Sequence, residues 1–408
     1  MHQFHRADGE REAGPRLVAS PVWSRWPVYS EAEIEEVVSC LRSGRVNALH
    51  HGERCRAFEQ ALARRCGRSH GIAVANGTLA LELALRGFGV GAGDEVVVPA
   101  RSFMASASCV AAVGAKPVFA DVDLECQGLT AATIAARITA RTRAIIVVHL
   151  AGWPCQMDDI MALARRHNLL VIEDCAQAHG AKLNGRQVGS FGDAAAFSFC
   201  TDKIISTGGE GGMLLLDDEG AWARAWAYKD HGKSPHPPAH NGLPGSFRWL
   251  HQSIGSNYRM TEMQAGIGLC QLDQLDRWLE IRRRNAAILN RHLAGTEAVR
   301  LTEPPPWVEH AYYKFYAFIR PEALRPLWSR DRIVAELIAY GIPAGSGSCP
   351  EIYLEAAFCT GSTGLERLPN AFLLGRTSMM VPVDPTLSEA DMHHMGRSIV
   401  HCLRSASA

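Results

Sequence analysis

Short apolar runs that alternate with helical segments between residues 73 and 217 restrict the fold of this chain more than any other feature. The runs have strand length, and a segment with helical spacing at residues 157–167 separates two of them. Buried parallel strands read as continuous apolar runs, and alternation with helices is typical of a sheet covered on both faces. We therefore predict an α/β fold with a mostly parallel sheet, whose strands include residues 96–99, 117–120, 144–149, 169–172 and 194–199.

Charged side chains follow the last two of these runs, at the points where the predicted strands end. Glu173 and Asp174 follow the fourth run, and Lys203 follows the fifth, just before a glycine-rich turn. The carboxyl ends of parallel strands face the crevice in which α/β proteins bind ligands. Glu173 points to the opposite face of the strand from Asp174, so the two acids are not equivalent. A pyridoxal phosphate enzyme needs such a pair, an amine for a Schiff base and an acid for the pyridinium nitrogen.

Lysine is scarce in this chain, and that scarcity narrows the choice of the amine. Arginine supplies nearly all the other cationic side chains, and arginine cannot form a Schiff base. Lys203 follows an apolar strand and precedes a run of glycines, whereas the other lysines lie at a strand start, in polar turns, in a charged stretch or among tyrosines. Those other lysines are Lys116, Lys182, Lys229, Lys233 and Lys314.

Composition excludes several classes of protein. A chain of 408 residues is long enough for two domains, and its formal net charge of zero and lack of a basic patch argue against a nucleic-acid partner. The 12 cysteines show no CxxC spacing, so we expect free thiols in a reducing compartment and neither disulfides nor a metal site. We find no secretory signal and no membrane span, and we expect a cytoplasmic protein.

The remaining patterns suggest two domains after a tail. Residues 1–20 are predicted to be a flexible tail, and Ser30 with Glu33 forms a capping box before a helix. The loop at 229–249 is rich in Pro, Gly and His, and it is long enough to be a functional or interface loop. We predict a large domain over 21–285 and a smaller α+β domain over 286–408, with helices at 54–65, 272–293, 330–340 and 389–403 and a strand at 313–319.

Five motifs resemble, in order, those of the DegT/DnrJ/EryC1/StrS aminotransferase family. They are NGTLALELAL from Asn76, GDEVVVPARSFMASA from Gly93, IEDCAQAHGA from Ile172, FSFCTDKIISTGGEGG from Phe197 and GSNYRMTEMQAGIG from Gly255. The resemblance implies a fold-type I pyridoxal phosphate transferase. Its large domain would hold a mostly parallel, seven-stranded sheet flanked by helices, and its C-terminal domain would be α+β.

The resemblance also implies roles for individual residues around pyridoxal 5'-phosphate. Lys203 would form the Schiff base and then move a proton as general base and acid, and Asp174 would pair with the pyridinium nitrogen. In the family, other side chains at matching positions stack on the ring, bind its 3'-oxygen or bind the phosphate. The full set of cofactor-binding residues is Gly77, Thr78, Phe103, Asp174, Gln177, Ser198, Lys203 and Asn257.

Some of these residues also have simpler explanations, which stay open. Gly77 and Thr78 could be an ordinary helix start, and Phe103 could be a core side chain. Asn257 would reach the partner subunit's phosphate, which implies a homodimer with shared active sites, or it could cap the helix that follows.

The residues that recognise the substrate are less well defined by the sequence. The C-terminal half, which should shape the pocket, departs from the family pattern, and the aromatic run at 312–316 could be plain strand core. Substrate candidates are His179, Arg259, Tyr313 and Lys314.

The resemblance implies an aminotransferase that moves an amino group from L-glutamate or L-glutamine to a keto sugar, nucleotide-linked in our interpretation, by a ping-pong mechanism. Such enzymes serve polysaccharide or antibiotic biosynthesis. Three alternatives remain: a cyclitol ketone as acceptor, a pyridoxal-dependent sugar dehydratase, and a non-catalytic regulator that retains the fold. The dehydratases of this fold have histidine where Lys203 stands, and the complete set Asp174, Gln177, Ser198 and Lys203 argues against a loss of catalysis.

Overall fold

The computed structural model describes residues 21–48, 52–236, 250–359 and 366–407. The tail predicted at residues 1–20 and residues 237–249 of the predicted loop lie outside this range. Among the described residues, no helix has both the length and the apolar character needed to cross a bilayer. All 12 cysteines are free thiols, as the sequence predicts.

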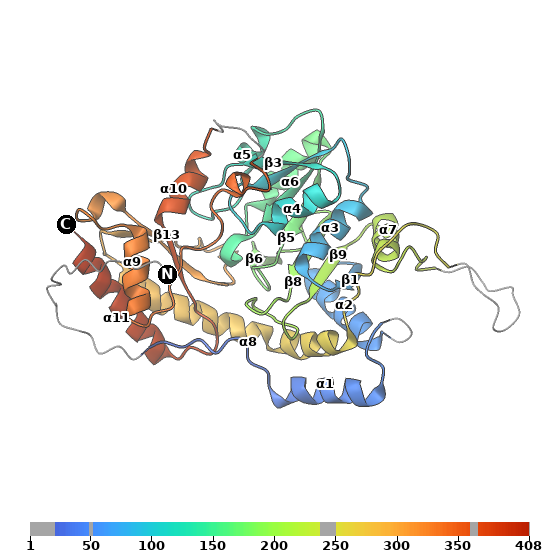
Figure 1. Ribbon diagram of the computed structural model, residues 1–408, viewed down its shortest axis with the longest axis horizontal. Coiled ribbons are helices and arrows are strands. Elements are labelled where there is room, and N and C mark those ends of the chain that lie inside the picture. The colour runs from blue at the N-terminus through green and yellow to red at the C-terminus, as the bar shows by residue number, and fades with distance from the viewer. Residues whose placement is uncertain (1–20, 49–51, 237–249, 360–365, 408) are drawn as a thin grey trace, which may run out of the picture.

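A seven-stranded sheet forms the centre of the molecule (Figure 1). β9 is antiparallel to both of its neighbours, β1 and β8, and the other neighbouring strands are parallel. The predicted mostly parallel sheet is therefore confirmed. In spatial order the strands are β1 (His70–Val74), β9 (Gly212–Leu216), β8 (Ala194–Ser198), β5 (Leu170–Asp174), β4 (Thr142–Val148), β2 (Glu95–Pro99) and β3 (Lys116–Ala120).

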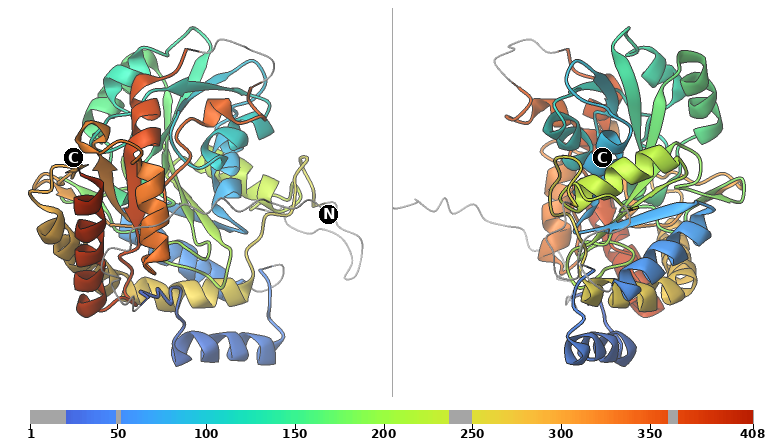
Figure 2. Two further views of the ribbon diagram at one scale, coloured as in Figure 1. Left: turned by 60° about the vertical axis from the view of Figure 1, so that its left-hand side comes forward. Right: turned by 90° about the vertical axis from the view of Figure 1, so that its right-hand side faces the viewer.

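Both faces of this sheet are buried, which explains why its strands are continuous apolar runs. Val96 and Val98 of β2 pack on one face with helices α3, α4 and α7, whereas Val97 between them packs on the opposite face with α6. Helices accordingly flank the sheet on both sides (Figure 2). The helices of this part are α1 (Glu31–Ser43), α2 (Glu53–Cys66), α3 (Gly77–Gly87), α4 (Ala105–Ala112), α5 (Ala131–Ala135), α6 (Met157–His167) and α7 (Glu219–Lys229).

The long helix α8 (Glu262–Leu293) runs below the sheet and on to the C-terminal helices (Figure 1). It begins earlier than the predicted helix at 272–293, because Thr261 and Gln264 form a capping box. The predicted boundary between residues 285 and 286 falls inside α8, and the division into two domains stays a prediction.

The C-terminal part has its own antiparallel sheet and its own apolar core. The strand predicted at 313–319 begins later, at Phe315, because the backbone N–H of Tyr313 donates to the carbonyl of Ala151 at 2.9 Å, outside this sheet. The sheet consists of β10 (Val299–Arg300), β12 (Phe315–Ile319) and β13 (Ser378–Val381), and the helices are α9 (Arg330–Ala339), α10 (Pro369–Thr377) and α11 (Glu389–Ala406).

Short elements complete the fold. A small antiparallel sheet joins the two parts of the chain and consists of β6 (Lys182–Leu183), β7 (Arg186–Gln187) and β11 (Val308–Glu309). The described residues also form the 3-10 turns η1 (Leu150–Gly152), η2 (Pro321–Ala323) and η3 (Ile352–Leu354).

Candidate active site

One cavity of about 570 Å³ lies at the carboxyl ends of β4, β5 and β8. Its walls come from both parts of the chain, because Gly347, Ser348 and Met380 line it together with the strand ends of the large sheet. The structure brings eight of the predicted site residues to this cavity: Gly77, Thr78, Phe103, Asp174, Gln177, Ser198, Lys203 and Tyr313.

Lys203 lies in the loop between β8 and β9, with its side chain 16% exposed. Its Nζ is 3.5 Å from Oδ1 of Asp202 and 3.5 Å from the hydroxyl oxygen of Tyr313. Tyr313 also donates a hydrogen bond from its hydroxyl to Asp202. Burial alone would raise the pKa of the Asp202 carboxyl, but the charge of Lys203 and this hydrogen bond lower it overall. The amine therefore stands beside an ionised carboxylate and a phenol.

Asp174 is buried at the end of β5 and faces the same cavity. It accepts hydrogen bonds from the hydroxyl of Ser106 at 2.9 Å and from the backbone N–H of Ala176 at 3.1 Å. Within the described part of the chain it has no ion-pair partner, and burial raises the pKa of its carboxyl. A cationic N–H group brought into the cavity would supply the missing charge.

The N-terminus of α3 and the end of β8 form a small polar cradle. Asn76 caps the helix by accepting from the backbone N–H of Leu79 at 3.0 Å, and Gly77 and Thr78 begin the first turn. A Cβ atom on Gly77 would lie 2.6 Å from the Cβ of Ser198, so the close approach of helix and strand requires glycine. Free N–H groups at a helix start together with a serine hydroxyl suit a phosphate.

Gln177 is held so that one end of its amide remains available. Its Oε1 accepts a hydrogen bond from the backbone N–H of Ala151 at 2.7 Å, which leaves the amide nitrogen to donate to a ligand. Phe103 lines the cavity with 66% of its surface exposed, so a core role for this ring is wrong. The site can therefore hold a planar, cationic heterocycle that carries an aldehyde, a hydrogen-bonding oxygen and a phosphate.

Two substrate candidates, His179 and Arg259, do not line this cavity. His179 is buried against the rings of Phe197 and Phe199, with centroids 5.5 and 5.7 Å away. Burial and the charge of Lys203 lower its pKa to about 3, so its imidazole is neutral. Arg259 forms an ion pair with Asp230 at 2.7 Å.

Lys314 and Asn257 also lie outside the cavity lining. Lys314 is half-buried, with its Nζ 5.1 Å from the ring centroid of Tyr313. Asn257 is exposed, and the alternative that it caps the following helix is wrong, because Thr261 is the N-cap of α8. A role for Asn257 in the partner subunit's site stays a prediction.

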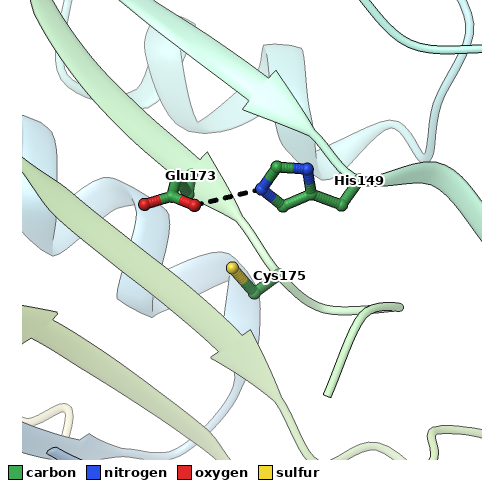
Figure 3. A group of neighbouring side chains, drawn as sticks. All are labelled: His149, Glu173 and Cys175. Carbon is green, nitrogen blue, oxygen red and sulfur yellow. Dashed lines mark hydrogen bonds and ion pairs between the residues drawn. The ribbon is translucent and has the colours of Figure 1, made fainter. Parts of the chain in front are cut away.

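A second group of polar residues lies at the ends of neighbouring strands, outside the cavity lining (Figure 3). His149, Glu173 and Cys175 are buried with their potential ligand atoms within 4.8 Å of one another. Nε2 of His149 lies 3.1 Å from Glu173, while Nδ1 of the same ring accepts from the backbone N–H of Cys155. Both ring nitrogens are thus in use within the protein, and the group fixes the ends of β4 and β5.

The carboxylate of Glu173 also has its hydrogen-bond partners within the protein. Its carboxylate accepts backbone N–H groups from Gly189, Phe191 and Gly192 at 2.7 to 2.8 Å. Burial would raise the pKa of Glu173, but His149 and these donors lower it overall. Glu173 therefore anchors the turn after β7, on the face of β5 that the sequence predicts, away from Asp174.

Sequence reasoning missed several residues that the structure brings to this region. Asp202 directly precedes Lys203 and could have been noticed as an acid beside the amine. Ser106, which donates to Asp174, and Trp26, which donates to the Lys203 carbonyl, have no local signal, because their contacts join distant parts of the chain. Glu210 and Cys200 also line the cavity.

Two curated proteins are similar to this chain over most of its length. The curated GDP-perosamine synthase of Caulobacter vibrioides is 38% identical over 362 residues, or 88% of this chain and 92% of the relative. A UDP-N-acetyl-3-dehydro-alpha-D-glucosamine 3-aminotransferase from Acidithiobacillus ferrooxidans is 40% identical over 291 residues, covering 71% and 73% of the two chains.

Solved structures share the fold. An aminotransferase from Psychrobacter cryohalolentis has a TM-score of 0.90 and 46% identity over 94% of this chain and 100% of its own. A protein from Streptococcus pneumoniae, solved in its PLP form, has a TM-score of 0.84 and 25% identity over 95% of this chain and 99% of its own. The profile of the DegT/DnrJ/EryC1/StrS aminotransferase family matches residues 27–400. This chain is therefore an aminotransferase that belongs to the DegT/DnrJ/EryC1/StrS family.

Proposed function

We propose that this aminotransferase uses pyridoxal 5'-phosphate, held covalently by Lys203. The observation that carries the proposal is the placement of Lys203 and Asp174 at one cavity, beside the cradle of Gly77, Thr78 and Ser198. When bound, the cofactor supplies an electron sink for the bonds at the reacting carbon. Asp174 would keep the pyridine nitrogen protonated, since a buried carboxylate stabilises an adjacent cation.

The protein's own residues would handle the proton. Once its amine is released, Lys203 takes the proton from the donor's α-carbon and returns it at a second carbon, as general base and acid. Asp202 and Tyr313 stand 3.5 Å from its Nζ and would hold the amine when it is protonated. Gln177 would orient the ring through its free amide nitrogen.

We propose L-glutamate or L-glutamine as the amino donor and a nucleotide-linked keto sugar as the acceptor, in a ping-pong sequence. The names of the two curated relatives support a nucleotide sugar. The cavity of about 570 Å³ lies within the range of small-molecule sites, about 300–1,000 Å³. Gly347, which has no side chain, and the small Ser348 leave room for the acceptor on the C-terminal wall.

A titration in visible light tests this function. We expect the purified protein to gain an absorption band when pyridoxal phosphate is added, and L-glutamate or L-glutamine to bleach it while a 2-oxo acid forms. Adding a nucleotide-linked keto sugar should then restore the band. An inosose, which is a cyclitol ketone, should not. Restoration by the inosose alone would move the acceptor to the cyclitols, and a protein that gains no band would overturn the proposal.

We also propose a homodimer with shared active sites. The cavity lining contains a single cationic side chain, Lys203, but three carboxylates, Asp174, Asp202 and Glu210, among the residues the structure describes. A phosphate and a carboxylate substrate need more positive or hydrogen-bonding groups than this wall provides. The partner subunit would supply them, with Asn257 as the predicted phosphate ligand.

The surface of α1 suits such an association. Ile34, Val38 and Leu41 lie on one face of this helix at helical spacing and are 46%, 36% and 54% exposed. Contiguous exposed apolar side chains of this kind mark interaction sites. The helix projects from the edge of the molecule beside α8 (Figure 1), where a second copy could cover it.

Complementation between two inactive variants tests the shared site. Co-expression of Lys203→Ala with Asn257→Ala should restore about a quarter of the wild-type activity, since half of the dimers would be mixed and each would have one intact site. Co-expression of Lys203→Ala with Asp174→Asn is the control, because both residues line the cavity of the same chain. Equal, negligible activity in both pairs would contradict the shared site.

The proposed location is the cytoplasm. Free cysteines suit a reducing compartment, and those inside the core are protected from oxidants by burial.

A further inference from the structure

The segment at residues 21–30, here called the N-terminal strap, connects the C-terminal part to the loop that carries Lys203. In Figure 1 it runs alongside α8 before α1 begins. At its start, the backbone N–H of Val22 donates to the carbonyl of Gly341 at 3.0 Å, and the hydroxyl of Ser24 donates to Asp384 at 2.6 Å. The strap is therefore anchored before it reaches the active site.

Trp26, in the middle of the strap, contacts the main chain of the active-site lysine. Its indole N–H donates to the carbonyl oxygen of Lys203 at 2.8 Å. The indole packs edge-to-face against Trp278 of α8, with ring centroids 4.8 Å apart at 89°. The guanidinium carbon of Arg282 lies 5.2 Å from the Trp26 ring centroid, which fits a cation–π contact. Two residues of α8 thus hold the indole in place.

Arg282 connects the same indole to the other side of Lys203. This arginine is fully buried and donates to the carbonyls of Tyr312 and Tyr313, both at 3.3 Å. The hydroxyl of Tyr313 in turn lies 3.5 Å from Nζ of Lys203. The main chain of Lys203 is therefore held by Trp26, and the environment of its amine is held through Arg282, which packs on Trp26.

The main chain around Lys203 is held in part by a contact from a distant segment of the chain. The backbone N–H of Lys203 donates to Cys200 at 3.0 Å, which is a contact inside the loop, whereas its carbonyl is held by a side chain far away in the sequence. Gly208 and Gly209 follow in left-handed conformations, with φ of 80° and 122°. A misplacement of about 1 Å at a catalytic group can cost about 100-fold in rate.

We propose that Trp26 is a positioning residue for Lys203, and that its indole N–H sets the main chain from which the amine reaches the substrate carbon. This inference rests on the proposed function, in which Lys203 carries the proton. No part of the five family motifs includes Trp26. The strap is thus a component of the active site, although it lies outside the cavity lining.

The variant Trp26→Phe removes the N–H and keeps an aromatic ring against Trp278 and Arg282. We expect the rate constant of the donor half-reaction, measured in a single turnover, to fall on the order of tenfold. The amplitude of that reaction should stay near the wild-type value. A purely structural defect would instead lower the amplitude, because fewer molecules would be competent. Trp23→Phe is the matched control, since Trp23 lies in the same strap with 75% of its surface exposed.

A second readout does not depend on turnover. The rate constant at which the cofactor-free protein captures pyridoxal phosphate, seen as growth of the visible band, should fall in Trp26→Phe by a similar factor. The melting temperature of the cofactor-free protein checks its folding. If Trp26→Phe does not fold, Tyr29→Phe replaces it, because the Tyr29 hydroxyl lies 3.2 Å from that of Ser206 in the same loop. We expect about a twofold slower capture in that variant.

The outcomes separate the two proposals. Rate constants in Trp26→Phe that equal those of Trp23→Phe and the wild type would overturn the role of Trp26 and leave the proposed function intact. In the fallback case, capture by Tyr29→Phe at the wild-type rate would overturn the claim that the strap holds the Lys203 loop, on which the role of Trp26 depends, and would leave the proposed function intact. A wild-type protein that forms no visible band would overturn both proposals.

Discussion

Replacing Lys203 by alanine is expected to remove the visible band of bound cofactor and to abolish amino transfer. Loss of the proton-transferring group alone costs about 10²–10⁴-fold, and loss of the covalent attachment adds to that. The measurement is a spectrum with pyridoxal phosphate before and after L-glutamate, together with the rate of 2-oxo acid formation. A band at the wild-type position and intensity in Lys203→Ala would contradict the assignment.

The fold should survive this substitution. Asp202 keeps its hydrogen bond from Tyr313 when Lys203 is shortened, and the main-chain bonds of residue 203 do not involve its side chain. Lys116→Ala is the matched control, because Lys116 is 71% exposed and its partner Glu95 retains an ion pair with Arg141 at 2.7 Å. We expect wild-type spectra and rates from the control, and equal melting temperatures for both cofactor-free variants.

The central sheet could be predicted from sequence because its strands are buried on both faces. The runs assigned to β2, β3, β4, β5 and β8 match the observed strands to within two residues at either end. The sequence pattern does not predict β1 and β9, because their sequences, HGIAV and GMLLL, include glycines that weaken a strand pattern. The antiparallel direction of β9 follows from tertiary packing, which no local pattern contains.

The same distinction between local sequence pattern and tertiary packing applies to the residues of the candidate site. Lys203 and Asp174 could be predicted because residues at the carboxyl ends of parallel strands face the ligand-binding crevice of an α/β sheet. Gln177 and His179 stand two residues apart in one motif, yet one lines the cavity and the other packs between Phe197 and Phe199. The irregular turn after β5 places Gln177 at the cavity and His179 in the core, and no local pattern predicts the path of that turn. Trp26 could not be found at all, because its contact with Lys203 spans 177 positions in sequence.

Asp174→Asn is expected to lower the rate of amino transfer by about 10²–10³-fold, the range observed when one preorganised electrostatic partner is removed. The substitution removes the charge and nearly preserves the shape, so the Ser106 hydroxyl can still donate to residue 174. Asp158→Asn, on the exposed first turn of α6, is the control for a lost carboxylate and should keep the wild-type rate. Because this control also loses one carboxylate, its rate shows how much of any change comes from the altered net charge alone.

The stability of the cofactor-free protein should change in the opposite direction from activity. Burial raises the pKa of the Asp174 carboxyl, so the folded chain binds the proton more tightly than the unfolded chain does. The cost to stability therefore grows as the pH rises from the usual value of 3.8 to the folded-state pKa, and it stays constant above that. At pH 8 the cofactor-free Asp174→Asn protein should melt at or above the wild-type temperature.

Pyridoxal phosphate should reverse this order. In the wild type, the carboxylate gains a cationic partner when the cofactor binds, so the cofactor should raise the melting temperature more than it does in Asp174→Asn. Melting curves of both proteins at pH 8, with and without the cofactor, give the four temperatures needed. An equal rise in the two proteins would show that Asp174 does not pair with the bound ring. A variant that is slower and yet more stable without cofactor would identify Asp174 as a residue kept for chemistry at the expense of stability.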